Sequence, residues 1–105
     1  MWKKKLENGL RKIASENEIV IRFENNDKII DVELSGMKYR YKIYRYKRHW
    51  SVCEMKGNGF GFQVISDWDG FNTLEDTAEA ILEDIQTKIV LLEDELEEAQ
   101  RIFNV

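Results

Sequence analysis

Residues 29–46, IIDVELSGMKYRYKIYRY, contain the pattern on which the fold depends. On both sides of Ser35-Gly36, apolar or aromatic side chains alternate with charged ones, and this period of two is typical of strands that bury one face. Because so short a link joins antiparallel strands and cannot form a parallel crossover, the stretch predicts a β-hairpin. Its second strand would place Tyr39, Tyr41 and Ile43 inside and Lys38, Arg40 and Lys42 outside.

The same alternation extends in both directions and is interrupted only by short clusters of turn residues. Short links between successive strands favour an antiparallel meander. At Ile43-Tyr44 the aromatic residues change to the other face, which indicates a β-bulge. Strands are predicted at 19–24, 29–35, 37–46, 49–55 and 60–66.

Helical patterns flank the strands on both sides. Over residues 2–15 apolar side chains recur at steps of three and four, which predicts an amphipathic helix. Thr73 has the position of an N-cap and Asp76 that of its capping-box partner, so a second helix is predicted from Thr73 to Phe103. We therefore predict an α+β fold in a single domain over 1–105: an N-terminal helix, an antiparallel meander of about five strands, and a long C-terminal helix packed on one face of the sheet.

The C-terminal helix is predicted to be longer than the sheet. It would span about 45 Å, whereas a strand of about seven residues spans about 23 Å. Apolar residues continue along the overhang and would need cover from a second copy of the chain or from another protein. The alternative is a bend at 86–88 that, with the first helix, hides them within one molecule. The residues assigned to self-association are Ile89, Val90, Leu91, Leu92 and Leu96.

Charge is divided unevenly along the chain, whose net charge is −4. Residues 1–66 contain 14 Lys or Arg and 8 Asp or Glu, a balance of +6, and residues 67–105 contain 2 and 12, a balance of −10. This separation of charge is consistent with a basic partner bound by the acidic helix, or with nucleic acid bound by the basic strands. It is equally consistent with electrostatic attraction between the two halves of the chain. The acidic residues predicted to contact a partner are Glu79, Glu83, Glu93 and Glu97.

The alternative surface for nucleic acid follows the basic, aromatic stretch 37–50. Lys and Arg bind phosphate and aromatic rings stack on bases, which is the combination that single-stranded nucleic acid requires. The residues assigned to this alternative are Tyr39, Arg40, Tyr41, Lys42, Tyr44, Arg45 and Lys47.

Gly59-Phe60-Gly61-Phe62 resembles the core of the RNP1 signature of RNA-recognition motifs, whose aromatic residues stack on bases. Asn58 and Gln63 depart from that signature, and the predicted order of helices and strands differs from that of the family. We therefore predict a glycine-rich hairpin whose Phe60 and Phe62 face the core.

Few residues suit catalysis or metal binding. His49 and Cys53 are each the only residue of their kind, which excludes a two-histidine metal site and an internal disulfide. Asp67 and Asp69 lack the spacing of a calcium loop, and we expect them to stabilise the start of the following helix. We predict no enzymatic activity, no metal and no cofactor.

These patterns predict a non-enzymatic, cytoplasmic protein-binding module. No apolar run approaches the roughly 20 residues of a membrane span, and the first residues alternate charged and apolar side chains, unlike a signal peptide. The abundance of Lys, Glu, Asn and Ile without proline is typical of AT-rich bacterial or phage genomes. The hypothesis is a phage or mobile-element inhibitor, a homodimer through its long helix, that mimics nucleic-acid charge and binds a basic, nuclease-like target.

Overall fold

The computed structural model describes residues 2–13, 19–24, 28–34 and 36–103; the side chains of Arg11, Ile13, Ile19 and 92–103 are not described. Helix α1 (Trp2–Ile13) comes first and helix α2 (Leu74–Phe103) comes last. Between them are β1 (Ile19–Glu24), β2 (Ile29–Leu34), β3 (Met37–Tyr46), β4 (His49–Gly57) and β5 (Phe62–Phe71). All neighbouring strands are antiparallel and their order in the sheet is that of the chain. The predicted α+β meander is confirmed.

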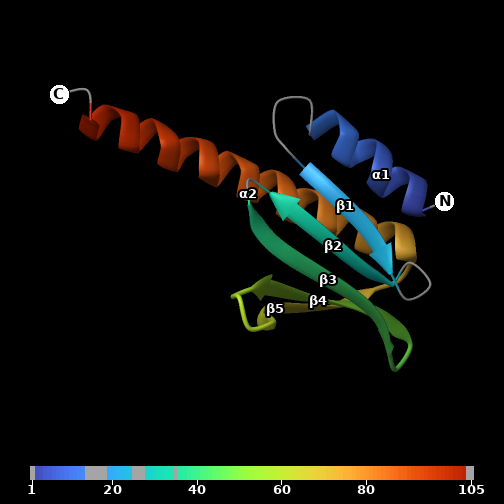
Figure 1. Ribbon diagram of the computed structural model, residues 1–105. Helices are drawn as coiled ribbons and strands as arrows, with labels where there is room; N and C mark the ends of the chain where they lie inside the picture. Colours follow the sequence, from blue (N-terminus) through green and yellow to red (C-terminus); the bar gives the residue numbers. More distant parts are fainter. Residues whose placement is uncertain (1, 14–18, 25–27, 35, 104–105) are drawn as a thin grey trace.

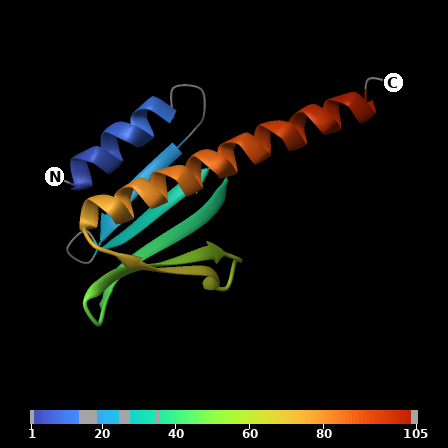
Figure 2. The same ribbon diagram turned by 180° about the vertical axis from the view of Figure 1, so that it is seen from behind.

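Both helices lie on one face of the sheet. α2 crosses behind the strands in Figure 1 and in front of them in Figure 2, and α1 runs beside it. No helix among the described elements covers the opposite face, which is called the open face below. Buried apolar side chains of the helices and the sheet form one core: Leu6, Leu10, Ile30, Val32, Leu34, Tyr39, Tyr41, Ile43, Val52, Ala78, Ile81, Ile85 and Ile89.

The hairpin predicted over 29–46 has the expected faces. β2 and β3 pair from Ile29 with Lys42 to Leu34 with Met37. The inward and outward residues of β3 are those predicted from the alternation. The predicted bulge at Ile43-Tyr44 is wrong, because β3 pairs with β4 without interruption and Tyr44 reaches the open face by ordinary alternation.

β5 continues to Phe71, well beyond its predicted end at residue 66. Asp67 and Asp69 therefore lie within the strand, and the prediction that they stabilise the start of the helix is wrong. The pairing of β4 with β5 has two register irregularities, and at each of them the alternation of inward and outward side chains along β5 shifts by one residue. The period of two that predicts a strand is therefore lost before β5 ends. The displaced register turns Trp68 toward the helices, where its ring centroid lies 6.2 Å from that of Tyr41.

α2 begins and extends as predicted. The Asp76 backbone N–H donates a hydrogen bond to Thr73 Oγ1 at 3.1 Å, which is the N-cap contact. The helix continues without interruption to Phe103, and its C-terminal part extends past the sheet (Figure 1). Of the helices that the structure describes, neither combines the length and the apolar character needed to cross a membrane.

α1 and α2 approach each other closely at Gly9. A Cβ atom added there would lie 2.7 Å from both Cδ atoms of Leu82 on α2. Gly9, which costs a helix about 1 kcal/mol relative to alanine, thus leaves room for this position of the Leu82 side chain.

Gly9→Val is therefore expected to lower the free energy of unfolding by about 1–2 kcal/mol, because the added side chain overpacks the contact. Urea denaturation measures this change. In a Leu82→Ala background, where the opposing side chain is removed, the same substitution should cost much less. An equal cost in both backgrounds would mean that packing against Leu82 is not the cause.

Candidate functional site

The part of α2 that leaves the sheet exposes apolar side chains. Ile89 still belongs to the core at 6% exposure, whereas Val90 and Leu91 are 50% and 56% exposed. A hollow of about 440 Å³ lies beside them and is also lined by Glu83, Gln86 and Thr87. Leu92 and Leu96, also predicted for self-association, lie outside the described side chains.

Two of the four predicted acidic contact residues can be placed. Glu79 is exposed, but Lys5 Nζ on α1 lies 2.7 Å from its Oε1 and offsets part of its charge. Glu83 is also exposed, borders the hollow and forms no ion pair with any residue that the structure describes. The side chains of Glu93 and Glu97 lie outside the described part. Glu83 is thus the predicted acidic group that lies next to exposed apolar surface.

A buried ionic cluster attaches α2 to the sheet just before its exposed part. Lys88 Nζ lies 2.9 Å from Glu54 Oε2 on β4 and 2.6 Å from Asp84 Oδ2, one helical turn earlier. The Tyr41 hydroxyl donates to the same Asp84 oxygen at 2.6 Å, and the Tyr39 ring centroid lies 5.0 Å from Lys88 Nζ. These contacts hold one turn of α2 against β3 and β4.

The two carboxyl groups of the cluster have pKa values shifted in opposite directions. Burial, and then the hydrogen bond with Asp84, raise the pKa of Glu54 to about 7. Burial alone would raise the pKa of Asp84, but hydrogen bonds with Glu54, Lys88 and Tyr41 lower it. Burial alone would lower the pKa of Lys88, but its hydrogen bonds to both carboxyl groups raise it. Glu54 therefore holds a proton up to near-neutral pH, while Asp84 stays ionised beside Lys88.

The sequence analysis did not predict this cluster, although part of its signal is local. Asp84 and Lys88 have the i, i+4 spacing of a helical ion pair. Glu54 lies two residues after the buried Val52 and so shares its face of β4. Only the packing of α2 on β4 shows that these charges meet.

The residues assigned to the alternative nucleic-acid surface lie on different faces. Tyr39 and Tyr41 are 7% and 0% exposed on the helix side, so their rings are not available to stack on a base. Arg40 lies on the open face and donates two hydrogen bonds to Asp31, from Nε at 2.6 Å and from Nη2 at 2.9 Å.

Of the other members, Lys42 and Tyr44 point to the open face, Arg45 lies near the end of β3 on the opposite face, and Lys47 lies in the β3–β4 turn. The Tyr44 hydroxyl donates to the Asp67 carboxylate at 2.9 Å, and Lys42 is exposed. Arg45 lies over the Trp50 ring at 5.0 Å, and Lys47 Nζ lies 5.4 Å from the Tyr46 centroid. The structure therefore does not bring the seven residues together on one surface.

His49 and Cys53 share a face of β4, as their spacing indicates, and lie roughly 13 Å apart along the strand. Burial, and then Asp67, raise the pKa of Cys53, which favours the protonated, unreactive thiol. Within the described ranges, no three His, Cys, Asp or Glu side chains are grouped as metal ligands would be.

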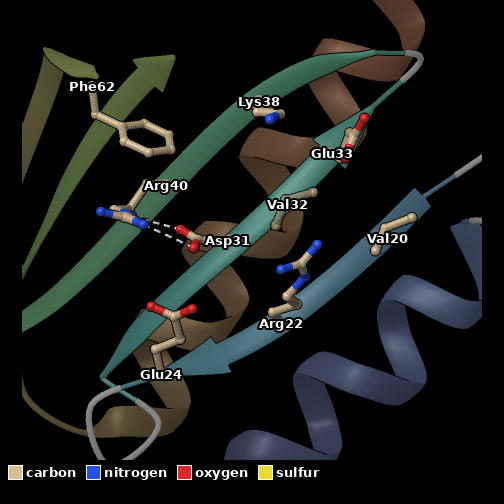
Figure 3. A pocket seen from close by; sticks show the side chains of 9 residues that line it. All are labelled: Val20, Arg22, Glu24, Asp31, Val32, Glu33, Lys38, Arg40 and Phe62. Carbon is tan, nitrogen blue, oxygen red and sulfur yellow. Dashed lines mark hydrogen bonds and ion pairs between the residues drawn. The ribbon is translucent and has the colours of Figure 1, made fainter. Parts of the chain in front are cut away.

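The link between β4 and β5 displays its aromatic side chains instead of burying them. Phe60 is fully exposed and Phe62 is half-buried on the open face, so the prediction that both face the core is wrong. Phe60 lies beyond Gly57 and Phe62, the last residues that pair β4 with β5, and this places its ring past the edge of the core. The Phe62 ring lies 4.1 Å from Arg40 Cζ, beside a hollow of about 300 Å³ (Figure 3).

The described surface thus offers two distinct features. One is the surface of α2 formed by the exposed Val90 and Leu91 with Glu83 beside them, and the other is formed by Phe60 and Phe62 at the β4–β5 link. No family model, curated protein or solved structure matches this chain.

Proposed function

We propose that the protein is a non-enzymatic, cytoplasmic protein-binding module and that α2 beyond Ile85 is its binding element. The observation that carries the proposal is the half-exposure of Val90 and Leu91 directly after the buried Ile89. Large exposed apolar side chains rimmed by polar ones are typical of protein-binding surfaces. The buried cluster around Lys88 supports the proposal, because it holds the preceding turn in place and so lowers the ordering cost of binding.

The charge of α2 favours a basic partner. Ten acidic and two basic residues occur between Leu74 and Phe103, and Glu83 borders the apolar hollow. Acidic groups along a helix compete with phosphate for the same Lys and Arg side chains. The proposed role is therefore that of an inhibitor, encoded by a phage or mobile element, that occupies the cationic channel of a nuclease-like protein.

The binding element is tested with a Val90→Ser/Leu91→Ser double variant. Loss of two central apolar contacts is expected to weaken capture of basic proteins from a bacterial lysate by about tenfold or more. Heparin should suppress capture by the unaltered protein, because it competes for the same cationic surface. The matched control is Val20→Ser, since Val20 is also 50% exposed but lies on β1. Equal capture by the double variant and the control would contradict the proposal.

A second copy of the chain is the other partner that this surface could accept. Light scattering combined with size-exclusion chromatography separates the two cases. A dimer that becomes a monomer in the double variant would assign Val90 and Leu91 to self-association, whereas an unchanged monomer mass assigns them to a different protein.

A further inference from the structure

The β4–β5 link exposes the Phe60 ring, and the first residue of β5, Phe62, places a second ring on the open face. The Phe60 backbone N–H donates to Asn58 Oδ1 at 3.1 Å, and the Asn58 N–H donates to the Gly61 carbonyl at 3.0 Å. These bonds shape a tight turn that presents the fully exposed Phe60 ring to solvent. Phe62, two residues later, lies on the open face over Arg40. An exposed ring on an ordered turn binds at a low cost in conformational entropy.

A basic hollow of about 470 Å³ is lined by Phe62 and by Gly59 and Gly61, the residues on either side of Phe60. Its lining combines glycines of two turns, Met37, Phe62, Lys38 and Lys56, and it includes no carboxylate. Lys38 and Lys56 are exposed and form no ion pair with the described part of the chain. The space beside Gly36, Gly59 and Gly61 is open: in the described structure, no atom lies within 4 Å of a Cβ built at any of them. A ligand can therefore approach the backbone there.

We propose that this end of the sheet binds single-stranded nucleic acid. The rings of Phe60 and Phe62 can stack on flat groups, and the ammonium groups of Lys38 and Lys56 can bind anions. A single-stranded nucleic acid offers both, because an unpaired base and a phosphate recur with every nucleotide. Paired and stacked bases of a duplex would not be free to contact Phe60 and Phe62. The surface is separate from the exposed end of α2, so this proposal does not depend on the proposed function.

The neighbouring hollow on the open face limits the site. This hollow of about 300 Å³ shares Lys38 and Phe62 with the basic hollow. It is also lined by Arg40, whose guanidinium is oriented by Asp31 (Figure 3). Its lining also includes Glu33, which lies opposite Lys38 on the neighbouring strand, and Glu24 at the far end of β1, and both carboxylates repel phosphate. The strand is therefore expected to follow the rings and end near Arg40.

Fluorescence anisotropy with a labelled oligothymidylate of about 12 nucleotides tests the proposal at about 50 mM salt. The intact chain should bind in a salt-dependent manner, and Phe60→Ala should weaken binding by about tenfold. Because Phe60 is fully exposed, this variant keeps the core intact. Lys38→Gln/Lys56→Gln should lower the slope of log affinity against log salt by about one to two.

Tyr46→Ala is the matched control, since Tyr46 is an exposed aromatic residue at the end of β3, next to Lys47 of the β3–β4 turn and at the opposite end of β4 from the link. It should leave binding unchanged. Loss of binding in Tyr46→Ala but not in Phe60→Ala would overturn the proposal in favour of the other turn. Absence of binding, or binding that depends on the lysines but not on Phe60, would overturn it as well. None of these results depends on Val90 or Leu91, so the two proposals fail or stand separately.

Discussion

Replacing Lys88 with methionine is expected to lower the free energy of unfolding by about 3–5 kcal/mol, because it removes one side of a buried ion pair. The side chain of Lys88 is 15% exposed, and those of Glu54 and Asp84 are 5% and 23% exposed. Without the ammonium group, the ionised Asp84 carboxylate would lose its cation at a place where little water can solvate its charge. Urea denaturation at pH 7 measures the loss.

Lys5→Met is the matched control for that experiment. The Lys5–Glu79 pair has nearly the same N–O distance, 2.7 Å, but both side chains are about half exposed to solvent. An exposed pair contributes only about 0–1 kcal/mol, since water screens it. If the two variants lost equal stability, burial of the cluster would not be what makes Lys88 important.

Glu54→Gln is expected to stabilise the protein at pH 8 by about 1–3 kcal/mol and to change its stability little at pH 5. The pKa of Glu54 is raised from 4.5 to about 7 in the folded state, so the folded chain retains a proton that the unfolded chain has lost between these values. The free energy of unfolding of the natural protein therefore falls as pH rises from about 4.5 to about 7. Glutamine resembles protonated glutamate and cannot ionise, which removes this fall.

Asp84 changes the pH dependence of the free energy of unfolding in the opposite direction to Glu54, and it does so at lower pH. Its pKa is lowered below the ordinary 3.8, so its contribution is present above that value and is lost as the pH falls through the lowered pKa. Denaturant titrations at a series of pH values above 4 report on Glu54 alone, because Asp84 stays ionised throughout that range. A decline between pH 5 and pH 8 that persists in Glu54→Gln would show that another group causes it.

Much of the fold follows from local patterns. The alternation over 29–46 and its two-residue link predict the hairpin and its faces, because a strand with one buried face needs this period. Thr73 and Asp76 predict the start of α2, because the first turn of a helix needs acceptors for its free N–H groups. The end of β5 was not predictable in the same way, since its register irregularities displace the alternation.

The candidate sites were less predictable, because exposure depends on what other elements cover. Tyr39 and Tyr41 have the same local pattern as a stacking surface, yet both rings are buried against the helices. Phe60 and Phe62 have the pattern of core residues, yet their place beside the last β4–β5 pair leaves them at the surface. The comparison of helix length with strand length needs no knowledge of the packing, and it indicated that α2 would extend past the sheet. It did not show which side chains the sheet covers: Val90 and Leu91 are exposed, whereas Ile89, assigned to the same set, is buried.

The sequence by itself determined the α+β class, the meander order, the start of α2 and its extension beyond the sheet, all of which arise from short-range periodicity, turns and caps. The tertiary structure decided which charges and rings meet. Glu54, Asp84 and Lys88 form a cluster, and Phe60 lies free, only because α2 packs on β4 while the β4–β5 link extends past the core. Burial and the pKa shifts that follow from it depend on contacts between residues far apart in the chain, which no local pattern contains.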